Sequence, residues 1–146
     1  MKKIGFFTPV LIIAVVVLFN SCGTSAKLSS VDALNGAWQL TELKDGGDES
    51  VHTNDMSTIA FDLAGKKVSG IAGCNNFVGG FTSEEAGKLT FGKLALTRKM
   101  CIGDLNAFEN LFTKKLELVN KFEVKDDNAL ILYTSDNSTI TYKKVQ

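Results

Sequence analysis

A series of short segments in which apolar and polar residues alternate limits this chain to a fold built from small strands. The alternation is clearest at 59–63, where Ile59, Phe61 and Leu63 fall on one face. Similar segments occur at 38–43, 67–72, 77–82, 88–91, 94–97, 122–125, 130–133 and 139–143. Glycine, aspartate and asparagine separate them, and most have no room for a helix between them. We therefore expect an antiparallel meander that curls or closes to hide its edges.

One longer segment has helical periodicity. Residues 104–120 begin with Asp104, a plausible N-cap, and carry charged residues such as Glu109 and Lys115 that are available for a solvent face. The apolar stripe comprises Leu105, Phe108, Leu111 or Phe112, Leu116 and Val119. We expect this stripe to pack on the sheet and plug it. The predicted fold class is α+β, mostly β: a small antiparallel barrel-like sheet of about eight short strands with one α-helix.

The first 21 residues have the features of an export signal. Lys2 and Lys3 precede an apolar run at 10–19, which is too short to span a bilayer, and Cys22 follows. A cysteine at this place resembles the lipobox of bacterial lipoproteins, although Phe19 and Asn20 depart from the usual pattern. The resemblance implies a signal peptide at 1–21 and acyl chains, such as palmitate, on Cys22. An ordinary signal peptide or an uncleaved anchor are the alternatives.

The segment after Cys22 sets the expected domain boundary and location. Residues 22–33 are mostly small and polar, which is typical of a flexible tether, and 34–146 form one domain without internal repeats. We expect a lipid-anchored protein of the outer membrane. Because no acidic run follows Cys22, the segment resembles lipoproteins that face the periplasm more than surface-exported ones.

Composition excludes several classes of function. The chain of 146 residues has a formal net charge of zero, so we expect no nucleic-acid partner. Its single histidine, His52, lies in a polar segment, and we expect no metal site there and no cofactor. The glycines around Gly73 lack the pattern of a phosphate-binding loop and are more simply explained by turns and bulges.

Two of the three cysteines remain if Cys22 is acylated. Cys74 and Cys101 could then form a disulfide in an oxidising compartment, which would close a loop of about 28 residues. They could instead be buried thiols that act as small apolar groups. A reactive thiol is the third alternative, although neither cysteine belongs to a CxxC motif.

Two motifs resemble a known bacterial family. The first is Gly73-Cys74-Asn75-Asn76-Phe77 followed by Gly79-Gly80-Phe81-Thr82, and the second is Leu94-Ala95-Leu96-Thr97-Arg98-Lys99-Met100-Cys101. Together with the segment 34–40 they resemble the META/HslJ-like domain of envelope proteins. The resemblance implies a small barrel-like sheet with one helix, a link to heat and envelope stress, and Cys74 and Cys101 close together. It assigns no catalytic residue, so we read the motif residues as structural.

These features leave two main functional hypotheses. The first is a monomeric, non-enzymatic envelope lipoprotein that binds another protein or supports the envelope under stress. The second is a carrier of an apolar ligand or lipid inside the barrel. The phenylalanines that could line such a cavity are Phe61, Phe77, Phe81, Phe91, Phe108, Phe112 and Phe122, which could equally form a packed core. An enzyme remains a third class, although no nucleophile and base pair is recognisable.

Overall fold

The computed structural model of the protein describes residues 29–47, 50–51 and 56–145. The predicted signal peptide, Cys22 and His52 lie outside the described residues. No helix within the described ranges combines the length and the apolar character needed to cross a membrane.

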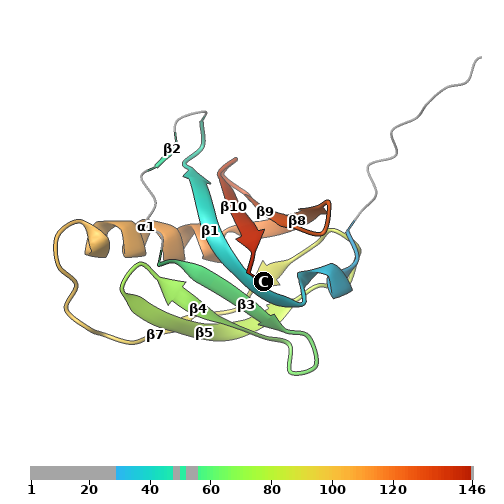
Figure 1. Ribbon diagram of the computed structural model, residues 1–146, viewed down its shortest axis with the longest axis horizontal. Helices are drawn as coiled ribbons and strands as arrows, with labels where there is room; N and C mark the ends of the chain where they lie inside the picture. The colour runs from blue at the N-terminus through green and yellow to red at the C-terminus, as the bar shows by residue number, and fades with distance from the viewer. Residues whose placement is uncertain (1–28, 48–49, 52–55, 146) are drawn as a thin grey trace, which may run out of the picture.

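The described strands form one antiparallel sheet that curls into a nearly closed barrel (Figure 1). Eight strands follow one another in the order β6-β5-β4-β3-β1-β10-β9-β8, while β2 pairs with β1 and β7 pairs with β5. Their bounds are β1 Gly36–Lys44, β2 Ser50–Val51, β3 Thr58–Asp62, β4 Lys67–Ala72, β5 Asn75–Thr82, β6 Thr90–Phe91, β7 Ala95–Leu96, β8 Val119–Lys125, β9 Ala129–Thr134 and β10 Thr139–Lys144. The predicted fold class is confirmed. β2 was not predicted, because its two residues lie in the polar segment around His52, which shows no alternation.

The two ends of the sheet meet along β8. The Phe122 amide donates to the Gly87 carbonyl at 2.8 Å, and Lys88 and Lys121 form an isolated antiparallel bridge. Ser29 covers the same edge further along, because its Oγ accepts a 2.7 Å hydrogen bond from the Val124 amide. These bonds satisfy backbone groups that an open edge would leave exposed.

The domain begins earlier in the structure than the expected boundary at Leu34. Ser29 is buried, and the short 3-10 helix η1 (Val31–Leu34) places the fully buried Leu34 against the barrel. The Trp38 indole donates to the Leu34 carbonyl at 2.9 Å. The end of the segment expected to be a tether is therefore packed, because Ser29 is buried and bonded to β8.

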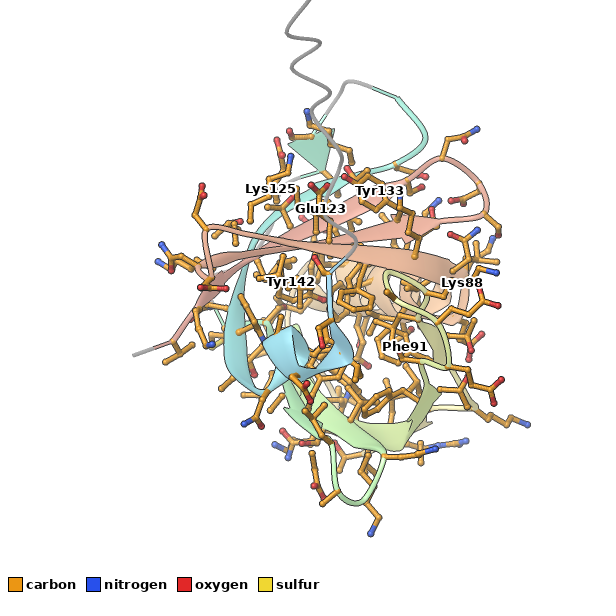
Figure 2. The ribbon with its side chains drawn as sticks, turned by 90° about the vertical axis from the view of Figure 1, so that its right-hand side faces the viewer. Lys88, Phe91, Glu123, Lys125, Tyr133 and Tyr142 are labelled. Atoms are coloured by element: carbon orange, nitrogen blue, oxygen red, sulfur yellow. A yellow bond between two sulfur atoms is a disulfide. The ribbon has the colours of Figure 1, made fainter. Side chains whose placement is uncertain are left out.

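Side chains fill the interior of the barrel. Phe61 contacts the rings of Phe81 and Phe91, and Phe77 contacts Phe112 of the helix. Figure 2, an end-on view, shows Tyr142 and Phe91 pointing into the space between opposite walls. Three surface hollows of about 310, 560 and 260 Å³ are lined by none of the seven phenylalanines considered above. The phenylalanines thus form a packed core rather than the lining of these hollows.

The helix α1 spans Leu105–Glu117 and covers part of this core. Phe108, Phe112 and Leu116 of the predicted stripe are buried, but Val119 belongs to β8. The expected end near residue 120 was therefore wrong: Val119 keeps helical spacing from Leu116 but pairs with Thr134 of β9. Asp104 stands at the N-cap position without a side-chain capping bond, so the predicted capping interaction is also absent.

Candidate functional site

A disulfide joins the two motif cysteines, Cys74 and Cys101, at one end of the barrel. Cys74 lies in the turn between β4 and β5, and Cys101 lies in the segment that leads to α1. Their Cα atoms are 6.0 Å apart. The sequence left open a disulfide, two buried thiols or a reactive thiol, and the structure contains the disulfide. The bond attaches residues 97–104 to the sheet.

Asn75, next to this disulfide, organises the surrounding segment. Its Oδ1 accepts hydrogen bonds from the Lys99 amide at 2.7 Å and the Thr97 hydroxyl at 2.8 Å. Its Nδ2 donates to Glu109 Oε1 at 3.0 Å and more weakly to the Lys99 carbonyl at 3.3 Å. Asn75 is only 3% exposed, so these bonds supply partners that water would otherwise provide. The side chain therefore has a structural role.

Glu109 ties the helix to the same cluster. Its second carboxylate oxygen accepts a 2.8 Å hydrogen bond from the Asn75 amide, so one asparagine binds both oxygens. The prediction that Glu109 faces solvent was wrong, since the residue is 8% exposed. Its partner lies 34 residues away in the sequence, and helical periodicity alone carries no signal for such a contact.

Two motif glycines are explained by close backbone geometry. Gly73 has a φ of +81°, a left-handed conformation that favours glycine, and its amide donates to Ser57 Oγ at 3.0 Å. A Cβ at Gly79 would lie 2.6 Å from a methyl carbon of Leu94. Both glycines therefore serve the fold: one forms the turn at Cys74, and the other admits the segment between β6 and β7.

The remaining motif residues divide into two groups. Asn76 and Thr97 hold β5 to the following segment, since the Asn76 amide donates to Thr97 Oγ1 at 3.1 Å and the Thr97 amide donates to the Asn76 carbonyl at 3.0 Å. Arg98 and Met100 are exposed and lie outside this polar cluster. The structure thus brings together the asparagines and the threonine, and leaves the arginine and methionine facing solvent.

A groove of about 560 Å³ opens beside the disulfide. We call it the Met100 groove; its apolar lining is Met56, Ile71, Met100, Ile102 and Leu105. Its floor is a row of neighbouring residues across adjacent strands, because Gln39 pairs with Thr58, Thr58 with Ile71, and Ile71 with Asn76. The sequence identified Met100 but missed Met56, Ile71 and Ile102. The one sequence signal for this groove was the placement of two apolar residues, Met100 and Ile102, on either side of Cys101.

The disulfide end is poorly suited to a metal ion. The sulfur atoms of Cys74 and Cys101 and a carboxylate oxygen of Glu109 lie within 4.8 Å of one another. Cysteine binds a metal ion as the thiolate, however, and these sulfur atoms are bonded to each other. The carboxylate is already occupied by Asn75. The donor set therefore does not fit a metal site.

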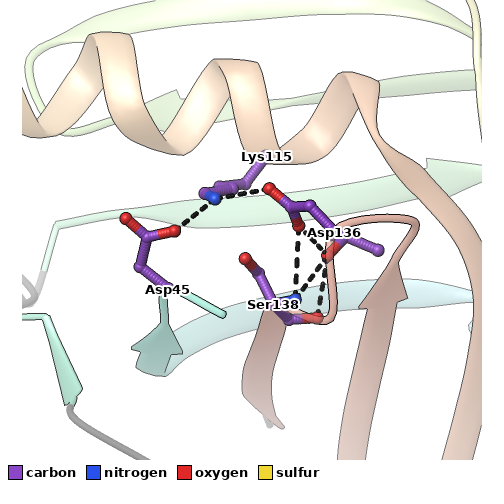
Figure 3. A network of polar contacts seen from close by, with 5 residues as sticks. Asp45, Lys115, Asp136 and Ser138 are labelled. Atoms are coloured by element: carbon purple, nitrogen blue, oxygen red, sulfur yellow. Dashed lines mark hydrogen bonds and ion pairs between the residues drawn. The ribbon is translucent and has the colours of Figure 1, made fainter. Parts of the chain in front are cut away.

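A second polar cluster fixes the other half of α1 (Figure 3). Lys115, which was expected to face solvent, is 6% exposed and forms ion pairs with Asp45 and, at 2.6 Å, with Asp136. The Lys115 ammonium and the hydroxyl of Thr134 hold the pKa of Asp136 well below its usual range, and these carboxylates raise the pKa of Lys115. The cluster joins the helix to the loop after β1 and the turn between β9 and β10.

Comparisons with solved structures give the same architecture. An NMR structure of a protein from Burkholderia xenovorans has a TM-score of 0.68 with 20% identity, over 79% of this chain and 86% of that chain. A second NMR structure is 29% identical with a TM-score of 0.54, over 76% of this chain and 90% of the other. A crystal structure of a DUF4847 family protein from Bacteroides vulgatus is 12% identical with a TM-score of 0.54, over 77% and 96%. The first and third likenesses concern the fold alone.

The fold and the disulfide-linked motifs define a small β-barrel domain closed by one helix. The model of the META domain matches residues 30–146, and the chain belongs to the META domain family. The resemblance inferred from the Gly73 and Leu94 motifs is therefore confirmed. No curated protein matches the chain.

Proposed function

We propose that this protein is a lipoprotein of the bacterial envelope, acylated at Cys22, whose META domain binds a partner protein and catalyses no reaction. The domain is monomeric in this proposal, and the outer membrane holds it facing the periplasm. This role would support the envelope under stress. The family comes from the match over residues 30–146; the anchor, the location and the binding of a partner are proposed in addition.

The disulfide carries the proposal for the location. Cys74 and Cys101 are bonded to each other, and disulfides persist in oxidising compartments such as the periplasm. The first segment independently has the order of an export signal, with Lys2 and Lys3, an apolar run at 10–19 and then Cys22. Acyl chains contribute about 0.8 kcal/mol per buried methylene, so more than one chain is sufficient for stable anchoring.

The polar cluster supports a binding role rather than catalysis. The polar atoms of Asn75, Thr97 and Glu109 form hydrogen bonds within this cluster and with backbone groups. A catalytic group needs an atom that can reach a substrate, whereas these atoms hold the segment 97–104 in place. The Met100 groove, which this segment borders, is the feature that a partner could contact.

A carrier function inside the barrel has less support. Phe61, Phe77 and Phe112 contact other aromatic rings in the core, and such contacts leave the interior occupied by side chains. Binding at the outer surface therefore fits the arrangement better than storage of a lipid within it.

Fractionation of cells that produce the full chain tests the anchor. The wild-type protein should be recovered with membranes, and Cys22→Ser should be recovered in the soluble periplasmic fraction. The double variant Cys74→Ser/Cys101→Ser is the matched control, and its folded fraction should remain with membranes. Membrane association of Cys22→Ser after removal of the signal would contradict the proposal. Protease added to whole cells tests the orientation: protection supports the periplasmic side, and cleavage opposes it.

A further inference from the structure

We infer that the Met100 groove binds an extended apolar segment of a partner protein that carries a carboxylate beside its apolar side chains. This inference rests on the proposed binding function and names the surface and the partner's chemistry. The groove combines exposed apolar walls, a fixed loop and a lysine in its lining, and each of these features restricts the occupant.

The walls of the groove are unusually exposed for their size. Met100 is 96% exposed, Ile102 is 88% exposed and Met56 is 55% exposed. These three belong to the five large apolar residues that are exposed within the described ranges; the others are Val78 and Val145. Apolar side chains gathered in one place and bordered by polar residues are typical of interaction surfaces. Methionine also adapts its shape to different apolar partners.

The loop that carries Met100 and Ile102 is held on both sides. The disulfide fixes Cys101 between these two residues, and Asn75 binds both the amide and the carbonyl of Lys99. A loop fixed before binding loses little conformational freedom when a partner docks. The same bonds keep apolar side chains at the surface, where they do not contribute to the core.

The shape of the groove distinguishes between kinds of occupant. An enclosed pocket would bury most of a small ligand, whereas Met100 and Ile102 stand almost entirely in solvent. A flat membrane surface would not fill a concave groove whose floor is a row of strand residues. The helix η1, close to the start of the described chain, also lies at the far end of the long axis from the loop that leads into α1 (Figure 1). An extended peptide segment fits a surface groove of this kind.

Charge further defines the partner. Lys99 is the one charged residue among the described lining residues of the groove. The exposed Arg98 and Asp104 each neighbour a lining residue in the sequence, so the charge within the lining itself is positive. Two copies joined through this face by a two-fold axis would bring like charges together. A carboxylate on the partner would complement the lysine and the arginine. The geometry therefore favours an apolar segment with an acidic residue over a second copy of this chain.

Methionine methyl signals offer a direct test. Of the three methionines in the chain, Met56 and Met100 both line the groove, so their methyl NMR signals report on its occupation. The full chain is produced with Cys22→Ser, so that no acyl chain competes for the groove. The probe is a synthetic peptide of alternating leucine and serine flanked by aspartate, and the matched peptide has lysine in place of aspartate.

The aspartate peptide should shift both methyl signals and bind at least about tenfold more tightly than the lysine peptide. Ile102→Ser should weaken binding about tenfold, while Val78→Ser, which lies outside the groove lining, should leave it unchanged. Arg98→Glu/Lys99→Glu should reverse the preference between the peptides. Intrinsic fluorescence of the buried Trp38 confirms that each variant is folded.

Several results would overturn the inference. These are no shift with either peptide, equal affinity for both, a response to phosphatidylglycerol vesicles alone, or methyl shifts that depend only on protein concentration. The last two outcomes would indicate a membrane surface and a second copy, respectively. Because binding is measured in solution, its failure is distinguishable from failure of the anchor, which cell fractionation reports.

Discussion

Helix α1 is attached to the sheet at two places by buried charges, and the two attachments differ in their partners. Glu109 binds a neutral amide, Asn75, which is 3% exposed. Lys115 binds two carboxylates, Asp45 and Asp136, whose side chains are 47% and 37% exposed. The attachment beside the Met100 groove is therefore dry, whereas the Lys115 attachment is bordered by water and depends on ionised aspartates.

The two attachments differ in how well they are protected from water, salt and acid. Water and salt weaken ion pairs at a surface, while a hydrogen bond in the interior is shielded from both. Acid should therefore loosen the Lys115 end of the helix by removing the charge of Asp136. The Glu109 end has the disulfide as a further support, which acid does not break. The walls of the groove are thus attached to the more protected end.

Removal of the disulfide should have the largest effect on the protected end. Cys74→Ser/Cys101→Ser opens a loop with a sequence separation of 27 residues, and chain entropy predicts a loss of about 3–4 kcal/mol in the free energy of unfolding. Urea unfolding of the variant, and of the wild type with and without reductant, measures this. An unchanged free energy of unfolding in both comparisons would show that other contacts alone fix the loop.

Replacement of Asn75 tests the dry attachment itself. Asn75→Ala removes the donor to Glu109 and the acceptor for the Lys99 amide, leaving polar groups buried without these partners. We expect a loss of about 2–3 kcal/mol in the free energy of unfolding. Asn76→Ala is the matched control, since Asn76 is exposed and its contacts in the cluster use the backbone. Similar losses in the two variants would refute a special role for Asn75.

The barrel was predictable from sequence because its strands carry a local signal. In 58–63 and 67–72 the buried side alternates with the outer side, so period and turn residues were sufficient. The turns were also readable: Asp126, Asp127 and Asn137 have positive φ, which aspartate and asparagine tolerate better than most residues. The end of α1 was misjudged because a spacing of three residues between Leu116 and Val119 fits a helix that continues as well as one that ends.

The attachments of the helix were not predictable in the same way. Charged residues on a helix usually face water, so Glu109 and Lys115 were expected at the surface. Their burial depends on Asn75 and Asp136, which are 34 and 21 residues distant in the sequence. The Met100 groove has the same origin, because its floor crosses several strands and its wall comes from the loop before α1. Pairing across the fold, rather than local periodicity, creates these features.

Acid should weaken the Lys115 attachment. Because the pKa of Asp136 is lowered in the folded protein, the folded state binds this proton less readily than the unfolded chain does. The contribution is present above the ordinary aspartate pKa, about 4, and is lost as the pH falls below it. Lys115→Met should lower the free energy of unfolding by about 1–2 kcal/mol at neutral pH and flatten its decline in acid.

Lys114→Met is the matched control for this measurement, since Lys114 is the exposed neighbour on the same helix. Its free energy of unfolding should follow the wild-type pH profile. Urea unfolding at a series of pH values provides the comparison. An equally steep decline in acid for Lys115→Met and the wild type would mean that other carboxylates dominate the acid response.

The smallest effect on stability is expected at the groove walls themselves. Ile102 is 88% exposed, so replacement by serine removes little apolar area that folding had buried. Ile102→Ser should therefore change the free energy of unfolding by less than about 0.5 kcal/mol, as surface substitutions usually do. Urea unfolding measures this change, and Ile59→Ser, at a fully buried isoleucine of β3, shows the loss expected for a core position. A loss for Ile102→Ser comparable to that for Ile59→Ser would place Ile102 in the core in solution and leave the groove without its exposed wall. A negligible loss, together with weaker peptide binding, would assign this side chain to recognition, because folding alone gives no reason for an apolar group there.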